Sequence, residues 1–260
     1  MKIVVCIKQV PATGADKRYT DDLRLDRAAA ETIINPLDEY AIEQALRLAD
    51  DGVADSVTYL SMGPEQASEA LRRALGMGGD DAVLITDPAL AGADEWATAR
   101  VLATALDKLG PDVSLMGMAS DDARGSLVPG AIAAMRDVPL LSYGAELKVA
   151  DGEARVRRLS ATGYDWIGAP LPVVATVTDQ VGEPRYASLK GIMGAKRKPL
   201  ETWSLADAGV SSDALRGAAL TRVTDARPPE DKPPTERIEN LPPTEAAARI
   251  ADWLAQRKLV

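Results

Sequence analysis

Histidine and phenylalanine are absent from this chain of 260 residues, and cysteine occurs once, as Cys6. Histidine is the commonest general base and metal ligand in proteins, so its absence excludes histidine-based catalytic triads and the usual zinc sites. A single cysteine cannot form an internal disulfide bond, and its apolar neighbours predict a buried thiol in a reducing compartment. Chemistry based on carboxylates, lysine or a bound cofactor remains open.

Segments for membrane insertion or export are also missing from the sequence. No run of about 18 apolar residues occurs, and the apolar N-terminal stretch is too short for the core of a signal peptide. We therefore expect a cytoplasmic protein that is not embedded in a membrane. The 39 acidic and 30 basic residues give a net charge of −9. This balance argues against nonspecific binding of nucleic acid, which relies on cations meeting phosphates.

What the sequence does contain is a regular alternation of strands and helices. Val- and Ile-rich runs predict strands at 2–10, 56–63, 81–86, 112–117 and 171–177. Helical spacing predicts helices that follow Asn35 and Pro64, one over 94–109, and one that begins near Ser126. Asn35 is expected as an N-cap, with Pro36 in the first helical position. The alternation predicts an α/β fold: a Rossmann-like, doubly wound, mainly parallel sheet with helices on both faces.

The texture of the chain changes in its second half. Residues 141–159 are typical of a β-hairpin whose turn is Asp151-Gly152. Six prolines predict an extended linker: Pro228, Pro229, Pro233, Pro234, Pro242 and Pro243. We therefore expect a nucleotide-binding domain over 1–226 and a C-terminal extension over 227–260.

A short amphipathic helix closes the chain. Thr244 is its expected N-cap, and Ile250, Trp253 and Leu254 lie on one face at helical spacing. That face either packs on the chain's own domain or docks on a partner, and the sequence favours neither.

Positive charge is concentrated in the segment 183–201 of this acidic chain. Between Glu183 and Glu201 no acidic residue occurs, whereas the segment holds five cations: Arg185, Lys190, Lys196, Arg197 and Lys198. Among them lie Leu189, Ile192 and Met193. The segment is either a docking surface, whose cations steer an acidic partner towards an apolar anchor, or a solvated segment with these apolar residues in the core.

Four stretches of the chain, in this order and spacing, resemble the beta subunit of electron-transfer flavoprotein. They are VVCIKQVP at 4–11, INPLDEYAIEQALRL at 34–48, SMGPEQASEALRRALGMGGDDAVLI at 61–85 and EPRYASLKGIMGAKRKPLE at 183–201. The resemblance implies a heterodimer with a larger alpha subunit, which supplies most contacts to a redox-active FAD. It also implies an AMP in the beta subunit, electron donation by dehydrogenases, and a quinone reductase or another protein as acceptor. Such a chain is an electron carrier without catalytic activity of its own.

The resemblance also assigns residues to sites. Together with the chemistry of Arg124 and Ser126, it leads us to expect a nucleotide beside Cys6, Asn35, Pro36, Leu37, Asp38, Met62, Gly117, Asp122, Arg124, Gly125, Ser126 and Val128. It places the partner dehydrogenase on Leu189, Lys190, Ile192, Met193, Lys196 and Arg197, with Leu189 as the apolar anchor. From the residues alone, the preferred roles are a core thiol for Cys6, a helix cap for Asn35 and a packing residue for Met62.

Two stretches depart from the family pattern. The family tends to carry GxQAxDxDxxQxG where this chain has GMASDDARGSLVPG over 117–130. Arg124 replaces the second aspartate of that pattern, and a guanidinium pairs well with phosphate oxygens. Whether AMP, a second FAD or nothing fills the pocket therefore stays open. At 159–162, Leu-Ser-Ala-Thr replaces an acidic residue and part of Asp-Gly-Gly, which predicts a specialised interface with the alpha subunit.

Two other functions compete with the electron carrier. One is a stand-alone adenine-nucleotide-binding module of the universal-stress type, and the other is an adenylating or hydrolytic enzyme on a similar sheet. No glycine-rich phosphate loop is evident, and the lack of histidine weakens the second alternative further.

Overall fold

The computed structural model describes residues 1–12, 14, 18–27, 29–211, 215, 218–227, 235 and 237–260. The chain divides into two compact units, Met1–Thr224 and Asp225–Val260. Four of the prolines that predict the linker, Pro228, Pro229, Pro233 and Pro234, lie outside the described residues.

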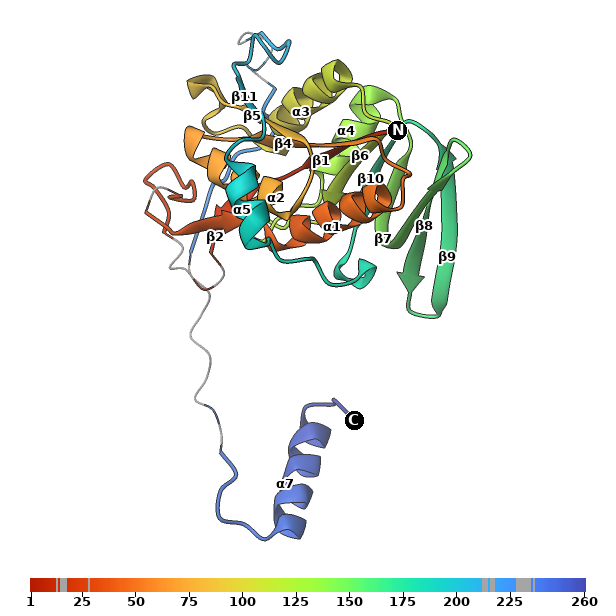
Figure 1. Ribbon diagram of the computed structural model, residues 1–260. Coiled ribbons are helices and arrows are strands. Elements are labelled where there is room, and N and C mark those ends of the chain that lie inside the picture. The colour runs from red at the N-terminus through yellow and green to blue at the C-terminus, as the bar shows by residue number, and fades with distance from the viewer. Residues whose placement is uncertain are drawn as a thin grey trace. The chain divides into compact units, whose positions relative to one another are not determined.

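The first unit is built on a nine-stranded sheet with the order β11-β5-β4-β1-β6-β10-β7-β8-β9, counted over the described residues (Figure 1). Its strands are β1 (Lys2–Cys6), β4 (Ser56–Met62), β5 (Asp81–Ile85), β6 (Val113–Gly117), β7 (Leu140–Ala150), β8 (Glu153–Ser160), β9 (Gly163–Pro170), β10 (Val173–Val177) and β11 (Leu200–Trp203). Neighbours from β11 to β7 run parallel, and β7, β8 and β9 are antiparallel.

Helices cover both faces of this sheet, which confirms the Rossmann-like prediction. The helices of the first unit are α1 (Pro36–Asp50), α2 (Ser68–Met77), α3 (Glu95–Leu109), α4 (Val128–Arg136) and α5 (Leu189–Ala195). Short 3-10 helices occupy Glu65–Ala67, Pro88–Leu90 and Asp179–Val181. Side chains of β1 alternate: Ile3 and Val5 join the core under α1 and α2, whereas Val4 and Cys6 join the core under α3 and α4.

The order of the strands places a topological switch point between β1 and β6. From β1 the chain adds β4 and then β5 on one side, and it returns to add β6 on the other side. Both strands end at the same edge of the sheet, since they are parallel. Open α/β sheets bind ligands at such an edge.

The strand predicted over 2–10 is confirmed over Lys2–Cys6, but its end is wrong, because the chain leaves the sheet after Cys6. Residues Gln9–Pro11 form β2, which pairs antiparallel with β3 (Thr32–Ile34) in a separate two-stranded sheet. Between β1 and β2, the Lys8 N–H donates to the carboxylate of Asp38 at 2.8 Å, and the Lys8 carbonyl accepts from Asn35 N–H. These bonds take the place of a β-ladder.

The hairpin with its turn at Asp151-Gly152 is confirmed, and both turn residues have positive φ. The sequence missed β9, which extends the hairpin to three strands. In β9, Ile167 and Ala169 face the core, whereas Tyr164 and Trp166 are exposed. This alternation is typical of a strand that packs on the core with one face and is exposed to solvent on the other.

The second unit contains α7 (Pro243–Gln256). The helix begins at Pro243, so the prediction of Thr244 as N-cap is wrong, and Thr244 lies in the first turn. Proline suits this position because its φ is helical and its missing N–H has no partner there in any case. No residue of α7 is buried, and Ile250 and Trp253 are exposed.

Candidate functional site

The buried carboxylate of Asp38 ties three elements together at the switch point. Asp38 lies in the first turn of α1, and its oxygens accept hydrogen bonds from Lys8 N–H at 2.8 Å and Gly117 N–H at 3.3 Å. Lys8 follows β1 and Gly117 ends β6. A Cβ on Gly117 would lie 2.6 Å from the Leu37 carbonyl oxygen. Glycine therefore permits the close approach of β6 to α1.

The environment of Asp38 disfavours its charged form. Burial raises the pKa of this carboxyl from 3.8 to about 7, although the hydrogen bonds from Lys8, Asn35 and Gly117 act in the opposite direction. The group is thus near the midpoint of its titration at neutral pH.

Asn35 precedes α1 as predicted, but its side chain does not cap the helix. Its amide donates to the Ala119 carbonyl at 2.9 Å, and its oxygen accepts from Asp121 N–H at 3.0 Å. Asn35 therefore fixes the loop that follows β6, which is the loop that departs from the family pattern.

Asp122 anchors the same loop from the other side. Its side chain is 1% exposed and accepts from Lys8 Nζ at 2.8 Å and from Arg27 at 2.6 Å. Burial alone would raise the pKa of Asp122, but the charge of Lys8 and the hydrogen bonds from Lys8, Ser120 and Arg27 outweigh it and lower the pKa to about 2. Sequence reasoning missed Lys8 and Arg27, because a lone cation after a strand is an unspecific signal.

The loop from Arg124 to Leu127 has an unusual backbone. Arg124 and Ser126 have positive φ values of 51° and 53°, and Leu127 returns to the right-handed helical region. When successive residues have right-handed and left-handed backbone conformations, their N–H groups point to the same side and form an anion-binding concavity. The hydroxyl of Ser126 donates to the Met118 carbonyl at 2.9 Å, which holds this shape.

Arg124 and Gly125 complete the loop. The guanidinium of Arg124 is exposed and donates to Asp121 at 2.8 Å. A side chain on Gly125 would overlap the carboxylate of Glu95 at the start of α3. The helix α4 begins directly afterwards, at Val128.

Of the other residues expected at the nucleotide, only Leu37 approaches this site, through its carbonyl beside Gly117. Cys6 and Met62 pack with the core under α3 and α4, and burial raises the pKa of the Cys6 thiol to about 12. Pro36 borders a separate cavity. The structure therefore brings Asn35, Asp38, Gly117 and the loop 119–128 together.

The basic segment 183–201 contains the short helix α5, with the Ser188 hydroxyl accepting from Gly191 N–H at its start. Four large apolar side chains of this segment are exposed: Tyr186 (95%), Leu189 (75%), Met193 (61%) and Ile192 (51%). The alternative that places Leu189, Ile192 and Met193 in the core is therefore wrong.

The five cations of this segment fall into two groups. Arg185 forms ion pairs with Glu43 and Asp50, and Lys198 donates to the carbonyls of Leu75 and Gly78. The other three, Lys190, Lys196 and Arg197, are exposed and form no ion pair with any residue that the structure describes. These three form the charged fringe of α5.

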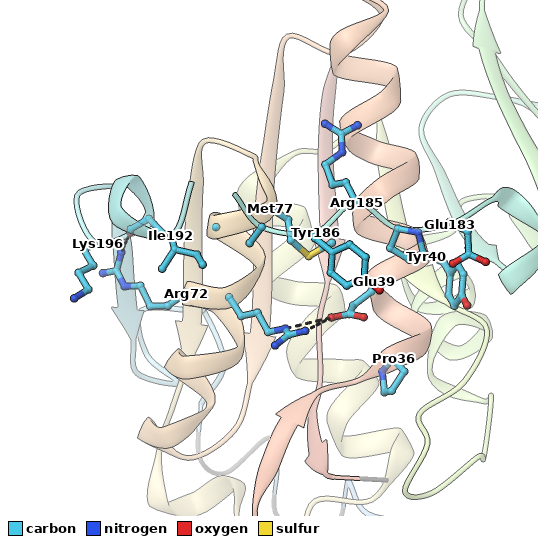
Figure 2. Close-up of a pocket in the computed structure, with 15 residues that line it drawn as sticks. Pro36, Glu39, Tyr40, Arg72, Met77, Glu183, Arg185, Tyr186, Ile192 and Lys196 are labelled. Carbon is cyan, nitrogen blue, oxygen red and sulfur yellow. Dashed lines mark hydrogen bonds and ion pairs between the residues drawn. The ribbon is translucent and has the colours of Figure 1, made fainter. Parts of the chain in front are cut away.

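A cavity of about 830 Å³ lies between α1, α2 and the basic segment (Figure 2). Tyr40, Met77, Tyr186 and Ile192 are among its lining residues. The ion pair of Arg73 with Glu39, 3.2 Å long, lies on its wall. This cavity adjoins the exposed apolar side chains of α5.

A second apolar surface lies on the outer strands of the sheet. Leu159, Tyr164 and Trp166 are exposed there, and Lys148 Nζ lies 4.7 Å from the ring centre of Trp166. Leu159 also lines a cavity of about 400 Å³. Leu159 is where the sequence lacks the family's acidic residue.

Neither a metal cluster nor a membrane-spanning helix occurs among the described residues. No group of three His, Cys, Asp or Glu residues is placed to hold a metal ion. None of the described helices has the length and apolar character needed to cross a membrane.

Comparisons with known proteins agree on one family. Residues 22–208 match the model of the electron transfer flavoprotein domain. The chain is 37% identical over 265 residues to the electron transfer flavoprotein subunit beta of Mycobacterium tuberculosis, with 99% of each chain covered. It is 36% identical over 262 residues to the subunit of the same name from Clostridium acetobutylicum, with both chains covered completely. It is 35% identical over 262 residues to the caffeyl-CoA reductase-Etf complex subunit CarD of Acetobacterium woodii, again over both full chains.

Proposed function

Because this chain belongs to the beta subunits of the electron transfer flavoprotein family, we propose that it pairs with an alpha subunit around FAD and carries electrons. The electrons come from partner dehydrogenases and leave to a quinone reductase or another acceptor. The observation that carries the proposal is the match of the whole chain to such subunits. A stand-alone module of the universal-stress type accounts for neither this match nor the exposed segment 183–201.

The basic segment supports the docking of a dehydrogenase. Leu189 projects from α5 with three quarters of its surface exposed. Burying such a side chain in a partner's pocket contributes about 1.5–3 kcal/mol. Lys190, Lys196 and Arg197 accelerate the encounter with an acidic surface but add little affinity each. Small, transient contacts of this kind suit electron transfer, in which each donor must leave quickly.

The outer strands supply a surface for the alpha subunit. Leu159, Tyr164 and Trp166 present apolar and aromatic area that a monomer has no reason to expose together. Aromatic side chains are enriched in the buried centres of interfaces. We assign this surface to the alpha subunit, which also provides most contacts to FAD. The flavin supplies the ring that accepts and releases electrons.

The edge at the switch point fits an adenine nucleotide, and AMP is the proposed occupant. The loop around Ser126 and the start of α4 offer backbone N–H groups to a phosphate. Arg124 is an exposed cation on that loop, and its guanidinium can donate two parallel hydrogen bonds to phosphate oxygens. Asp38 repels a phosphate only in its charged form, which burial disfavours.

Co-expression with the alpha subunit tests the proposal. The expected product is a yellow heterodimer that releases FAD and AMP when it is denatured. A dehydrogenase for CoA thioesters is a suitable first donor, since the related CarD subunit is named for a caffeyl-CoA reductase complex. A colourless homodimer would instead support the stand-alone module, and nucleotide turnover by the lone chain would support an enzyme.

A further inference from the structure

A buried carboxylate on α1 holds the beginning of the basic segment. Glu43 is 4% exposed, and its oxygens accept from the backbone N–H of Arg185 at 3.0 Å and from Arg185 Nε at 2.7 Å. The same guanidinium reaches Asp50, the last residue of α1, at 2.8 Å. One residue of the segment is thus fixed through both its backbone and its side chain.

Arg47 strengthens this anchor. It donates to Glu43 at 2.7 Å and to the carbonyls of Val181 and Glu183 at 2.9 and 3.2 Å. Burial raises the pKa of Glu43, but the hydrogen bonds and charge from Arg185 and Arg47 outweigh it, so the net pKa is lowered and the carboxylate stays charged. A charged carboxylate between two guanidiniums forms strong, directional bonds.

The other end of the segment is anchored to α2. Arg72 donates to the carbonyl of Ala195, the last residue of α5, at 2.7 Å and to that of Lys198 at 2.8 Å. In the middle, a side chain on Gly191 would overlap the carbonyl oxygen of Gly76, so the backbones of α5 and α2 lie in contact. In Figure 2, Arg185 lies above Tyr186, and Arg72 lies beside Ile192.

The helix α5, which lies between these anchors, is too short to be stable on its own. It has seven residues, and isolated helices shorter than about 12–15 residues are marginal in water. The side chains that would otherwise bury it, Leu189 and Met193, point to solvent. Its conformation therefore depends on its contact with α2 and on the anchors at both ends.

We propose that Glu43 is a positioning residue for the electron donor: by holding Arg185 it keeps the segment 186–195 in the conformation that presents Leu189. The inference rests on the proposed docking role of Leu189 and adds the device that prepares it. Without Glu43 the donor must order the segment when it binds. Each side chain that is immobilised on binding costs free energy, so the loss falls on affinity and leaves the electron-transfer step unchanged.

The test uses the FAD-loaded heterodimer and a donor dehydrogenase that reduces the wild type with saturation kinetics. The variants are Glu43→Gln, Leu189→Ala, and the double variant. Asp55→Asn is the matched control, because it likewise turns a carboxylate into an amide and removes an exposed ion pair, here with the N-terminus, outside both proposed docking surfaces. The KM for the heterodimer, the kcat, the FAD content, and hydrogen exchange of residues 186–195 are measured for each.

Glu43→Gln is expected to raise KM roughly tenfold at constant kcat and FAD content, with faster hydrogen exchange in 186–195. The double variant is expected to have a KM close to that of Leu189→Ala, because both changes affect one contact. The variant Glu43→Asp keeps the carboxylate and should recover part of the affinity. The control should match the wild type.

A wild-type KM for Glu43→Gln, or KM increases that multiply in the double variant, would overturn the positioning role. If Glu43→Gln does not fold, Arg185→Gln replaces it, since Glu43 then keeps its bond to Arg47. A heterodimer that lacks FAD, or that no dehydrogenase reduces, overturns the proposed function itself, and that outcome appears in the wild type before any variant is made.

Discussion

The side chain of Asn35 is hydrogen-bonded to the backbone of Asp121, at 3.0 Å, although the two residues are 86 positions apart in the chain. Asn35 precedes α1, and Asp121 lies in the loop after β6. The Asn35 amide also donates a second hydrogen bond to the Ala119 carbonyl, so the side chain both donates to and accepts from this loop. The start of one helix and the proposed phosphate loop are therefore one unit.

Replacing Asn35 by alanine is expected to loosen that loop. The change leaves a partly buried N–H and a partly buried carbonyl without their side-chain partner, which costs about 1 kcal/mol of stability. Chemical unfolding of the purified heterodimer measures this loss. AMP content should fall at the same time, because the loop that carries Arg124 and Ser126 is no longer fixed.

The matched control is Asn240→Gly, which removes the other asparagine of the chain, an exposed residue with positive φ in the second unit. It should change neither quantity. A normal AMP content in Asn35→Ala would contradict the coupling between the helix start and the loop.

Asp38 predicts an unusual pH dependence of stability. Its pKa is about 7 in the folded chain and 3.8 ordinarily, so below pH 3.8 both states are protonated. Between these values the folded state keeps a proton that the unfolded state has lost, and stability from this group falls as the pH rises. Above pH 7 the full penalty of the buried charge is present.

The variant Asp38→Asn removes this titration. From pH 5 to pH 8, the unfolding free energy of Asp38→Asn should fall less than that of the wild type. Asp122 does not interfere, because its pKa is lowered to about 2 and its effect lies below pH 4. Equal pH profiles for both proteins would rule out the raised pKa of Asp38.

The sheet was predictable from the sequence where the signal is local. Runs such as Val113–Gly117 are buried throughout and mostly apolar because parallel strands are covered on both faces, and such runs predict strands directly. The strand β9 was not predictable in this way, because only Ile167 and Ala169 face the core. The break after Cys6 depends on Asp38, which lies in another element.

The candidate site shows the same limit. The position of Asn35 before a proline predicts a helix start, and this is correct. The partner of its side chain is decided by the approach of β6, which no local pattern encodes. The exposure of Leu189 likewise depends on anchors at Glu43 and Arg72, so periodicity alone left two readings of the segment open.

Arg124 is expected to contact the phosphate of the nucleotide. Arg124→Ala should weaken AMP binding about tenfold, the effect of losing one charged hydrogen bond. Stability should change little, because the exposed pair of Arg124 with Asp121 contributes at most about 1 kcal/mol. Titration of the nucleotide-free heterodimer with AMP measures the affinity. Arg124→Lys keeps the positive charge but lacks the planar guanidinium, so its AMP affinity should lie between those of the wild type and Arg124→Ala. An unchanged AMP affinity in Arg124→Ala would exclude a contact between Arg124 and the phosphate.

Leu189 is expected to enter a pocket of the electron donor. The methyl groups that Leu189→Ala removes are exposed in this chain, so the change costs little folding stability, and its effect appears only when the donor binds. Losing most of the 1.5–3 kcal/mol that a buried leucine contributes corresponds to a KM increase of roughly tenfold. Steady-state reduction by the dehydrogenase measures this, with FAD content determined in parallel. Leu220→Ala, which changes a similarly exposed leucine outside the basic segment, should leave KM unaltered. If Leu189→Ala loses FAD while its KM stays constant, the segment supports the flavin site and does not dock the donor.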